Sequence, residues 1–353
     1  MARIPIPMDG DCMFLEGDLR VLRGGITESV HRVHVAVVDA EGELLASVGE
    51  VRHATFYRSA AKPFQTLPLV EDGVADRLGL TGEELAICSA SHNSEPRHLE
   101  LARSILAKAG IGEDALECGP HLPFPARETA ALLRSGKEPG PIHNNCSGKH
   151  AGMLALALAH GWPTAGYTRP DHPVQGRMLK EIARWSGVPE DDVGTGLDGC
   201  GVVCFAVPLA RMAGSFARFA RAAGEHAGVA RIVRSMTEHP FCIAGTGRLC
   251  TDLMRAAGGR IFVKTGAEGV YGAGVPGSGI GIALKVEDGA KRASDAALVR
   301  VLEELKLLSA DELDALRSFR TPEIRNTLGE VTGSVEATFS LERRGAVKGV
   351  AGP

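Results

Sequence analysis

The sequence of 353 residues is poor in aromatic side chains, which make up only 5% of it. Because nucleic-acid bases stack on aromatic rings in many single-strand binding sites, this scarcity argues against such a surface. An excess of one charge is also lacking, since 39 basic and 43 acidic residues give a formal net charge of −4. Neither a phosphate backbone nor an anionic membrane is therefore indicated as a partner.

Long hydrophobic runs are missing as well. The longest apolar run, residues 153–159, is much shorter than a membrane-spanning helix requires. The start of the chain, residues 1–7, contains no apolar stretch typical of a signal peptide. We therefore expect a cytoplasmic protein. In that reducing compartment the eight cysteines are expected to be core residues, reactive thiols or metal ligands rather than disulfides.

Secondary-structure patterns change along the chain, with no internal repeat and no low-complexity linker. Runs with strand character lie mainly near the two ends, at residues 19–23, 33–38, 44–48, 260–264, 279–286 and 334–341. The middle of the chain is mostly helical in pattern, and Ser294 is expected to cap a helix over 295–307. The order predicts an α+β fold, an antiparallel sheet flanked by helices with a mostly helical insertion.

We expect one structural unit over residues 15–345. Its parts are a sheet region from about 15–58 and 240–345 and a helical region from about 59–239. The two ends, residues 1–14 and 346–353, are expected to be flexible.

A Ser-x-x-Lys pattern is the first candidate for chemistry. Ser59 and Lys62 are three positions apart, so a helix would place the hydroxyl and the amine on one face. Pro63 belongs in the first turn of a helix, which Pro68 is expected to break. Lys62 would then lie at the positive end of the helix dipole, where partial burial disfavours a charged amine. A neutral amine beside a hydroxyl is a general base beside a nucleophile. The alternative is that Ser59 caps the helix and Lys62 extends to solvent.

A Lys-Thr-Gly triplet begins at Lys264, at the end of a predicted strand. Together with an upstream Ser-x-x-Lys it forms the element pair of penicillin-recognising enzymes. In those enzymes the edge strand holds the substrate, and its lysine supplies positive charge beside the nucleophile. Their third element, Ser-Asp-Asn, is matched only in part by the Ser-His-Asn triplet from Ser91 to Asn93.

Two cysteines far apart in the sequence are candidates for a metal site. Cys146 and Lys149 stand at the start of a predicted buried helix, where backbone N–H groups favour a thiolate. Cys200 follows Asp198 in a glycine-rich loop. The two thiols could share Zn²⁺, or both could be buried core thiols. Asp198 is expected at an exposed loop tip, where it could pair with a ligand's α-ammonium group or close an Asx-turn.

Five stretches, taken in order, resemble the rhizobial-type (class 3) L-asparaginases. They are Arg58–Gln65, Ser89–Asn93, Asn144–His150, Leu197–Gly201 and Lys264–Gly269. The stretch from Arg23 to His31 also fits the start of that family, so the resemblance runs from about Arg23 to Thr332. Val203 stands where the family pattern has proline, and the tail from Leu341 onward is not matched.

This resemblance implies a fold similar to serine β-lactamases and glutaminases, a homodimer, and hydrolysis of L-asparagine to L-aspartate and ammonia. It also implies two Ser–Lys pairs and a zinc site that includes a lysine, an unusual ligand because its amine must be neutral to bind a metal. The implied residues are catalytic Ser59, Lys62, Ser91 and Lys264; substrate-binding Asp198 and Asn93; and metal-binding Cys146, Lys149 and Cys200.

We expect Ser59 to attack the side-chain amide while Lys62 takes its proton, although either serine has the required chemistry. Ser91 and Lys264 are expected to relay the proton to the leaving ammonia. The alternatives are a glutaminase or another Ser–Lys amidase or acyl hydrolase. A different class, a non-catalytic zinc-binding or amino-acid-binding protein on the same scaffold, also remains open.

Overall fold

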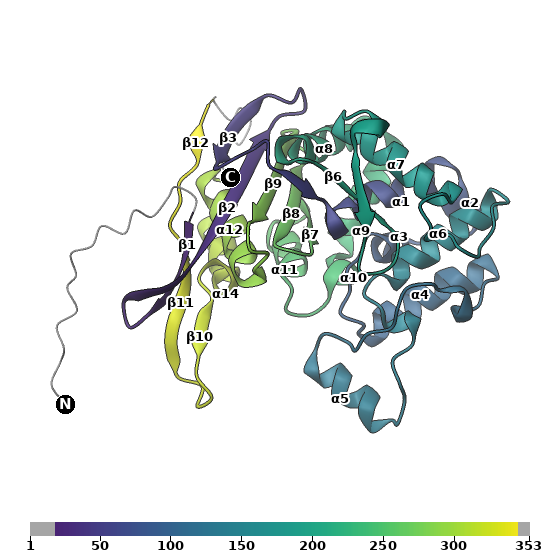
Figure 1. Cartoon of the computed structure of the whole chain (residues 1–353), viewed down its shortest axis with the longest axis horizontal. Coiled ribbons are helices and arrows are strands. Elements are labelled where there is room, and N and C mark those ends of the chain that lie inside the picture. Colours follow the sequence, from purple (N-terminus) through teal and green to yellow (C-terminus); the bar gives the residue numbers. More distant parts are fainter. Residues whose placement is uncertain (1–17, 345–353) are drawn as a thin grey trace.

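The computed structural model describes residues 18–344 and has the predicted α+β architecture, built around an antiparallel sheet of nine strands (Figure 1). These strands are β1 (Asp18–Arg23), β2 (Ile26–Val38), β3 (Leu44–Val48), β7 (Phe262–Gly266), β8 (Val270–Val275), β9 (Ile280–Val286), β10 (Glu323–Arg325), β11 (Val331–Ala337) and β12 (Glu342–Arg343). They follow the order β10-β11-β1-β2-β9-β8-β7, with β3 between β2 and β12. Both ends of the described chain therefore contribute to one sheet, as predicted.

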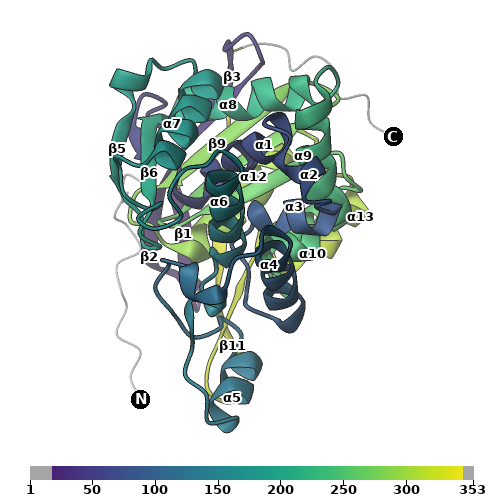
Figure 2. The ribbon, with the colours of Figure 1, turned by 90° about the vertical axis from the view of Figure 1, so that its right-hand side faces the viewer.

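The helices lie mostly between these two groups of strands. They are α1 (Lys62–Glu71), α2 (Val74–Arg77), α3 (Gly82–Cys88), α4 (Pro96–Ala109), α5 (Ala126–Arg134), α6 (Ser147–Ala159), α7 (Pro173–Ser186), α8 (Leu209–Ala222), α9 (Ala227–Glu238), α10 (Pro240–Ala244), α11 (Leu249–Ala256), α12 (Lys291–Glu304), α13 (Ala310–Ala315) and α14 (Arg317–Arg320). Figures 1 and 2 both show α5 projecting away from the other helices. The helical part also contains a second, three-stranded sheet. Its strands, in spatial order, are β4 (Ala54–Phe56), β6 (Val203–Pro208) and β5 (Gly194–Leu197).

Glycines allow α8 to pack directly on the main sheet. A Cβ atom at Gly281 of β9 would collide with the backbone of α8 at Ala213 and Ala217. One at Gly272 of β8 would collide with the ring of Phe216, also in α8. Because these positions have no side chain, the helix backbone approaches the strands closely.

Helix α12 contacts the same strand β9, as well as β2 and β8. Side chains on both faces of β9 are buried, with Ile280 and Ile282 on one face and Ala283 on the other. A strand whose alternate positions are all apolar and buried lies between two layers. The sheet is therefore covered by helices on both sides, and its buried residues join the helices in one hydrophobic cluster.

Two local predictions were wrong. Helix α1 starts with Pro63 in its first turn, as expected, but continues through Pro68 to Glu71. Its packing against α7 and α9 outweighs the hydrogen bond that an internal proline removes. Helix α12 begins at Lys291 with Ala290 as its N-cap, so Ser294 lies inside the helix and does not cap it.

None of the helices in residues 18–344 combines the length and the apolar character needed to cross a bilayer. The predicted flexible ends, residues 1–14 and 346–353, lie outside the described residues. The division of the chain into one unit over 15–345 stays a prediction.

Candidate active site

Ser59 lies in a short 3-10 turn, η1 (Arg58–Ala61), between β4 and the central helix α1. The preceding residue, Arg58, has a φ of 48°, a left-handed conformation that is uncommon outside glycine. Its guanidinium holds Asp198, with a distance of 2.8 Å between Nε and Oδ1. A strained residue restrained by an ion pair next to a candidate nucleophile is typical of functional sites.

The glycine of the Lys-Thr-Gly triplet explains how Lys264 reaches this turn. A Cβ atom at Gly266 would lie 2.5 Å from the carbonyl oxygen of Tyr57, immediately before η1. The end of β7 can therefore pass directly against η1, and the two elements are in contact. This close approach brings Lys264 from a distant part of the chain to the start of α1.

A second glycine brings the Ser91 segment into the site. At Gly148, near the start of α6, a Cβ atom would collide with the carbonyl of Ile87 at the end of α3. The segment after α3 is then held by backbone hydrogen bonds, from Ser91 N to Ile243 O at 2.9 Å and from His92 N to Asn145 O at 3.1 Å. Helix α6 and the Ser91 segment therefore lie side by side.

Ser91 stands between two buried lysines. Its Oγ lies 3.0 Å from Lys62 Nζ and 2.8 Å from Lys264 Nζ. The exposed fractions are 4% for Ser91, 1% for Lys62 and 0% for Lys264. Three residues that the sequence analysis proposed as catalytic are thus in direct contact, although 29 positions separate Ser91 from Lys62 and 173 separate it from Lys264.

Lys62 does not hydrogen-bond to Ser59, contrary to the pairing that the Ser-x-x-Lys spacing suggested. Within the described residues the Ser59 side chain has no hydrogen-bond partner, and the Lys62 amine points inward. It donates to Ser91 Oγ, to the carbonyl of Ala90 and to Cys146 Sγ, the last at 3.1 Å. Three acceptors match the three N–H donors of an ammonium group, which a single serine hydroxyl could not satisfy in a buried position.

Burial lowers the pKa of Lys264 well below the usual range, and the nearby charge of Lys62 lowers it further. Its amine also lies 2.9 Å from the carbonyl oxygen of Thr265. A neutral amine in contact with a serine hydroxyl can accept a proton, and this is the chemistry expected of a general base.

Ser59 and Ser91 both line a cavity of about 190 Å³. The remaining lining residues are Phe124, Asn145, Arg248, Thr265, Gly266, Ala267, Glu268, Gly269, Gly289, Lys291 and Ser294. Drug-sized ligands occupy pockets of roughly 300–1,000 Å³, so this cavity suits a smaller molecule. Both cationic and anionic side chains line it.

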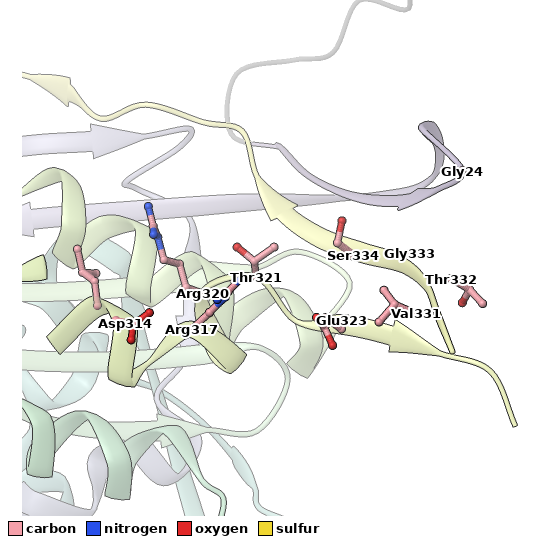
Figure 3. Close-up of a pocket in the computed structure, with 11 residues that line it drawn as sticks. Gly24, Asp314, Arg317, Arg320, Thr321, Glu323, Val331, Thr332, Gly333 and Ser334 are labelled. Carbon is pink, nitrogen blue, oxygen red and sulfur yellow. The ribbon is translucent and has the colours of Figure 1, made fainter. Parts of the chain in front are cut away.

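A larger cavity of about 750 Å³ lies at the edge of the main sheet, between α13, α14 and the β10–β11 hairpin (Figure 3). It is lined by side chains such as Arg317, Arg320 and Glu323, and by none of the residues that the sequence analysis proposed. It has no serine–lysine contact among the described residues, so the smaller cavity is the candidate active site.

The three predicted metal ligands come together beside this site. Lys149 Nζ lies 3.0 Å from Cys200 Sγ, and a hydrogen bond joins the two cysteine side chains. That hydrogen bond from Cys146, aided by the charge of Lys149, lowers the pKa of Cys200 to about 5. The same hydrogen bond, together with burial, raises the pKa of Cys146 to about 12. Both neighbours therefore favour the thiolate form of Cys200.

This donor set fits zinc in its chemistry. Two sulfurs and one nitrogen are ligand types that Zn²⁺ prefers. Burial lowers the pKa of Lys149, but Cys200 and Cys146 outweigh it and raise the pKa overall, so a metal would have to displace a proton from this amine. Residues 18–344 contain no group of three His, Cys, Asp or Glu side chains placed to hold a metal, so Lys149 would have to be the third protein ligand.

The two predicted substrate-binding residues both have partners within the protein. The side chain of Asp198 is only 11% exposed, and its Oδ1 accepts hydrogen bonds from Arg58 and from the backbone of Gly199. Burial raises the pKa of Asp198, but the charges of Lys149 and Arg58 outweigh it and lower the pKa overall. Asn93 Oδ1 accepts from Arg248 at 2.8 Å. Neither Asp198 nor Asn93 lines the cavity.

Several of the site's residues were missed by the sequence analysis. Arg248, Glu268 and Phe124 line the cavity, and Arg58 pairs with Asp198. The Gly-Thr-Gly-Arg stretch that ends at Arg248 was the available signal, because its glycines allow the backbone to approach a ligand closely. Nothing local to the sequence indicates that Arg248 meets Asn93, since 155 positions separate them.

Comparisons with known proteins complete the description. The family model described as L-asparaginase II matches residues 19–337. A search of curated proteins gave no match. Among solved structures, native Mglu in 4.3 M NaCl is similar with a TM-score of 0.43 and 16% identity, over 80% of this chain and 63% of that one. Another Mglu structure has a TM-score of 0.36 and 14% identity, over 79% of this chain and 68% of that one. The chain thus spans 63% of the length of the first of these structures.

Proposed function

The chain belongs to the L-asparaginase II family, and from that premise we propose that it is an amidohydrolase that converts L-asparagine to L-aspartate and ammonia. The observation that carries this proposal is the Ser91 hydroxyl in contact with two buried lysine amines, beside a small cavity that Ser59 also lines. A hydroxyl joined to two amines is suited to moving protons, and a second serine at the same cavity is available as the nucleophile.

We propose different tasks for the two lysines. The Lys62 amine donates hydrogen bonds to three acceptors, as an ammonium group can, whereas burial lowers the pKa of Lys264 well below its usual range and disfavours a charge there. Ser91 can accept a hydrogen bond from Lys62 while it donates its own proton to Lys264. A proton that moves along this path to Lys264 leaves Lys62 neutral, three positions from Ser59.

The reaction then follows in two stages. Ser59 Oγ attacks the side-chain carbonyl carbon and loses its proton to Lys62, while backbone N–H groups such as that of Ser59 stabilise the oxyanion. Ser91 and Lys264 return a proton to the amide nitrogen, the C–N bond breaks and ammonia leaves. Water then attacks the acyl-enzyme, gives one proton to the lysine–serine relay, and releases aspartate as the proton returns to Ser59 Oγ.

Asp198 is proposed to bind the α-ammonium group of the substrate. The contacts of Asp198 with Arg58 and Gly199 both use Oδ1, and among the described residues Oδ2 accepts no hydrogen bond. A negative charge at this point complements an ammonium group. Asp198→Ala should therefore raise KM for L-asparagine, and an unchanged KM in this variant would exclude the proposed role.

We also propose that Cys146, Lys149 and Cys200 bind zinc. A bound zinc ion would supply a positive charge that helps to position the substrate. Purified protein should then contain about one zinc per chain, a content that Cys200→Ser removes and the neighbouring control Cys204→Ser keeps. Elemental analysis measures this directly. Metal-free protein with full activity would show that zinc is not required.

The test of the proposed function is ammonia release by the purified wild-type protein. L-asparagine should be hydrolysed faster than L-glutamine, and a β-lactam should not be hydrolysed, since the cavity is small. Faster release from L-glutamine would favour a glutaminase instead. Binding of an amino acid without turnover would favour a non-catalytic amino-acid-binding protein. A homodimer and a cytoplasmic location are further proposals, which light scattering and cell fractionation would test.

A further inference from the structure

Arg248 is a cation at the cavity that forms no ion pair with any described residue. It stands immediately before α11 and lines the same cavity as Ser59 and Ser91, with its side chain partly buried. Within residues 18–344 no carboxylate lies within ion-pair distance of its guanidinium. By contrast, Arg255 on α11 pairs with Asp252 one turn away. A partly buried guanidinium without a counter-ion, facing a cavity, is placed to receive an anionic group.

The guanidinium is oriented by Asn93, whose own hydrogen bonds determine which way its amide points. Asn93 Nδ2 donates to the carbonyl of Thr246 at 3.0 Å and to Glu95 Oε1 at 3.2 Å. Its Oδ1 is therefore directed to Arg248, from which it accepts a hydrogen bond at 2.8 Å. Because Asn93 is only 2% exposed, this bond is protected from water.

A second contact holds Arg248 from another side. The ring of Phe124 lies 5.6 Å from the Arg248 Cζ atom, a distance typical of a cation–π interaction. Phe124 belongs to the segment just before α5 and lines the cavity as well. Two neighbours therefore restrain the guanidinium, and neither of them neutralises its charge. An arginine oriented in this way loses little entropy when it binds a carboxylate.

We infer that Arg248 binds the α-carboxylate of the substrate and that Asn93 positions it. This inference rests on the proposed function, because it assigns one end of an amino-acid substrate to a particular side chain. A guanidinium offers parallel N–H donors that match the two oxygens of a carboxylate. The site thereby selects amides that carry a carboxylate over simple amides of the same length. Arg248 is thus a specificity residue, and Asn93 acts through it.

The experiment compares Arg248→Gln with the control Arg255→Gln, which lies on the same stretch but outside the cavity. In Arg248→Gln, KM for L-asparagine should rise roughly 10- to 100-fold, with a smaller change in kcat, because a charge-assisted contact is lost. Calorimetry should show the same weakening for L-aspartate. Binding of β-alanine, which lacks the α-carboxylate but keeps the amine and the other carboxylate, should change no more than in the control.

Asn93→Ala should also raise KM for L-asparagine and weaken the binding of L-aspartate, in both cases by less than Arg248→Gln does. If Asn93 acts only through Arg248, the double variant Asn93→Ala/Arg248→Gln should have the KM of Arg248→Gln alone. Two fully additive effects would instead show that Asn93 contacts the substrate independently and would overturn its assignment as a positioning residue.

The measurements separate this inference from the proposed function. Wild-type ammonia release with equal KM values in Arg248→Gln and Arg255→Gln would overturn the inference and leave the function intact. Absence of ammonia release, together with Arg248-dependent binding of L-aspartate, would overturn the function and support the carboxylate site. Equal weakening of L-aspartate and β-alanine binding would show that Arg248 only maintains the structure, and would also overturn the inference.

Discussion

Replacement of Ser59 by Ala should lower kcat for amide hydrolysis by roughly 10⁴-fold or more and leave the fold intact. The loss is large because the Oγ atom that forms the acyl bond is absent. Folding should be unaffected, since the Ser59 side chain has no hydrogen-bond partner among the described residues and its removal leaves no buried group unsatisfied. Ammonia release and thermal unfolding, measured on the same preparation, give both quantities.

The decisive control is Ser91→Ala, because Ser91 is the cavity hydroxyl that contacts both lysine amines. Ser59→Ala and Ser91→Ala should both release ammonia slowly, but only Ser59→Ala should be unable to form the acyl-enzyme. Hydroxylamine added to the wild-type reaction should take the aspartyl group from the acyl-enzyme and yield β-aspartyl hydroxamate. In a separate reaction without hydroxylamine, stopped with acid, mass spectrometry should locate the aspartyl group on the peptide that contains Ser59. An aspartyl group found on Ser91, or near-normal turnover by Ser59→Ala, would refute the assignment of the nucleophile.

Lys264→Met should lower kcat by roughly 10²- to 10⁴-fold, the usual contribution of a general base, and should raise stability at neutral pH. The two effects have one cause. Burial lowers the pKa of Lys264 well below its usual range, so the native state disfavours the charged amine, whereas the unfolded chain carries it freely. Keeping this amine neutral costs stability, and methionine fills a similar volume without that cost.

The pH dependence of this effect has a definite sign. The unfolded chain binds more protons than the native protein between the lowered pKa of Lys264 and about 10.4, the value of an unperturbed lysine. The native protein therefore gains stability as pH rises through this window, and the advantage of Lys264→Met should shrink toward its upper end. Activity that depends on neutral Lys264 should likewise rise with pH, along a limb well below pH 10.

Denaturant unfolding at several pH values measures the stability difference, and Lys180→Met, an exposed lysine on α7, is the matched control. If Lys264→Met were less stable than wild type at neutral pH, the amine would serve the structure and not the chemistry. A pH–rate profile with the same acidic limb in wild type and variant would equally exclude Lys264 as the proton acceptor.

Much of the fold could be predicted because it depends on patterns a few residues long. The strand character predicted for residues 33–38 and 44–48 is confirmed, since they lie in β2 and β3, which pair with each other. Pro63 predicted the first turn of α1, and the buried helix predicted to start at Cys146 to Lys149 is α6, whose N-cap is Cys146. Where tertiary packing overrides a local preference, prediction failed, as it did at Pro68 within α1 and at Ser294 within α12.

By itself, the sequence determined the chemical inventory: two serines and two lysines in recognisable motifs, two cysteines beside a third lysine, and glycines at the points of closest backbone approach. Only the tertiary structure decided which of these groups meet. It turned Lys62 away from Ser59 toward Ser91, and it paired Arg58 with Asp198 and Asn93 with Arg248. The reason is physical. A buried amine or guanidinium takes the partners that satisfy its hydrogen bonds, and these partners come from distant segments that only the packed fold brings within reach.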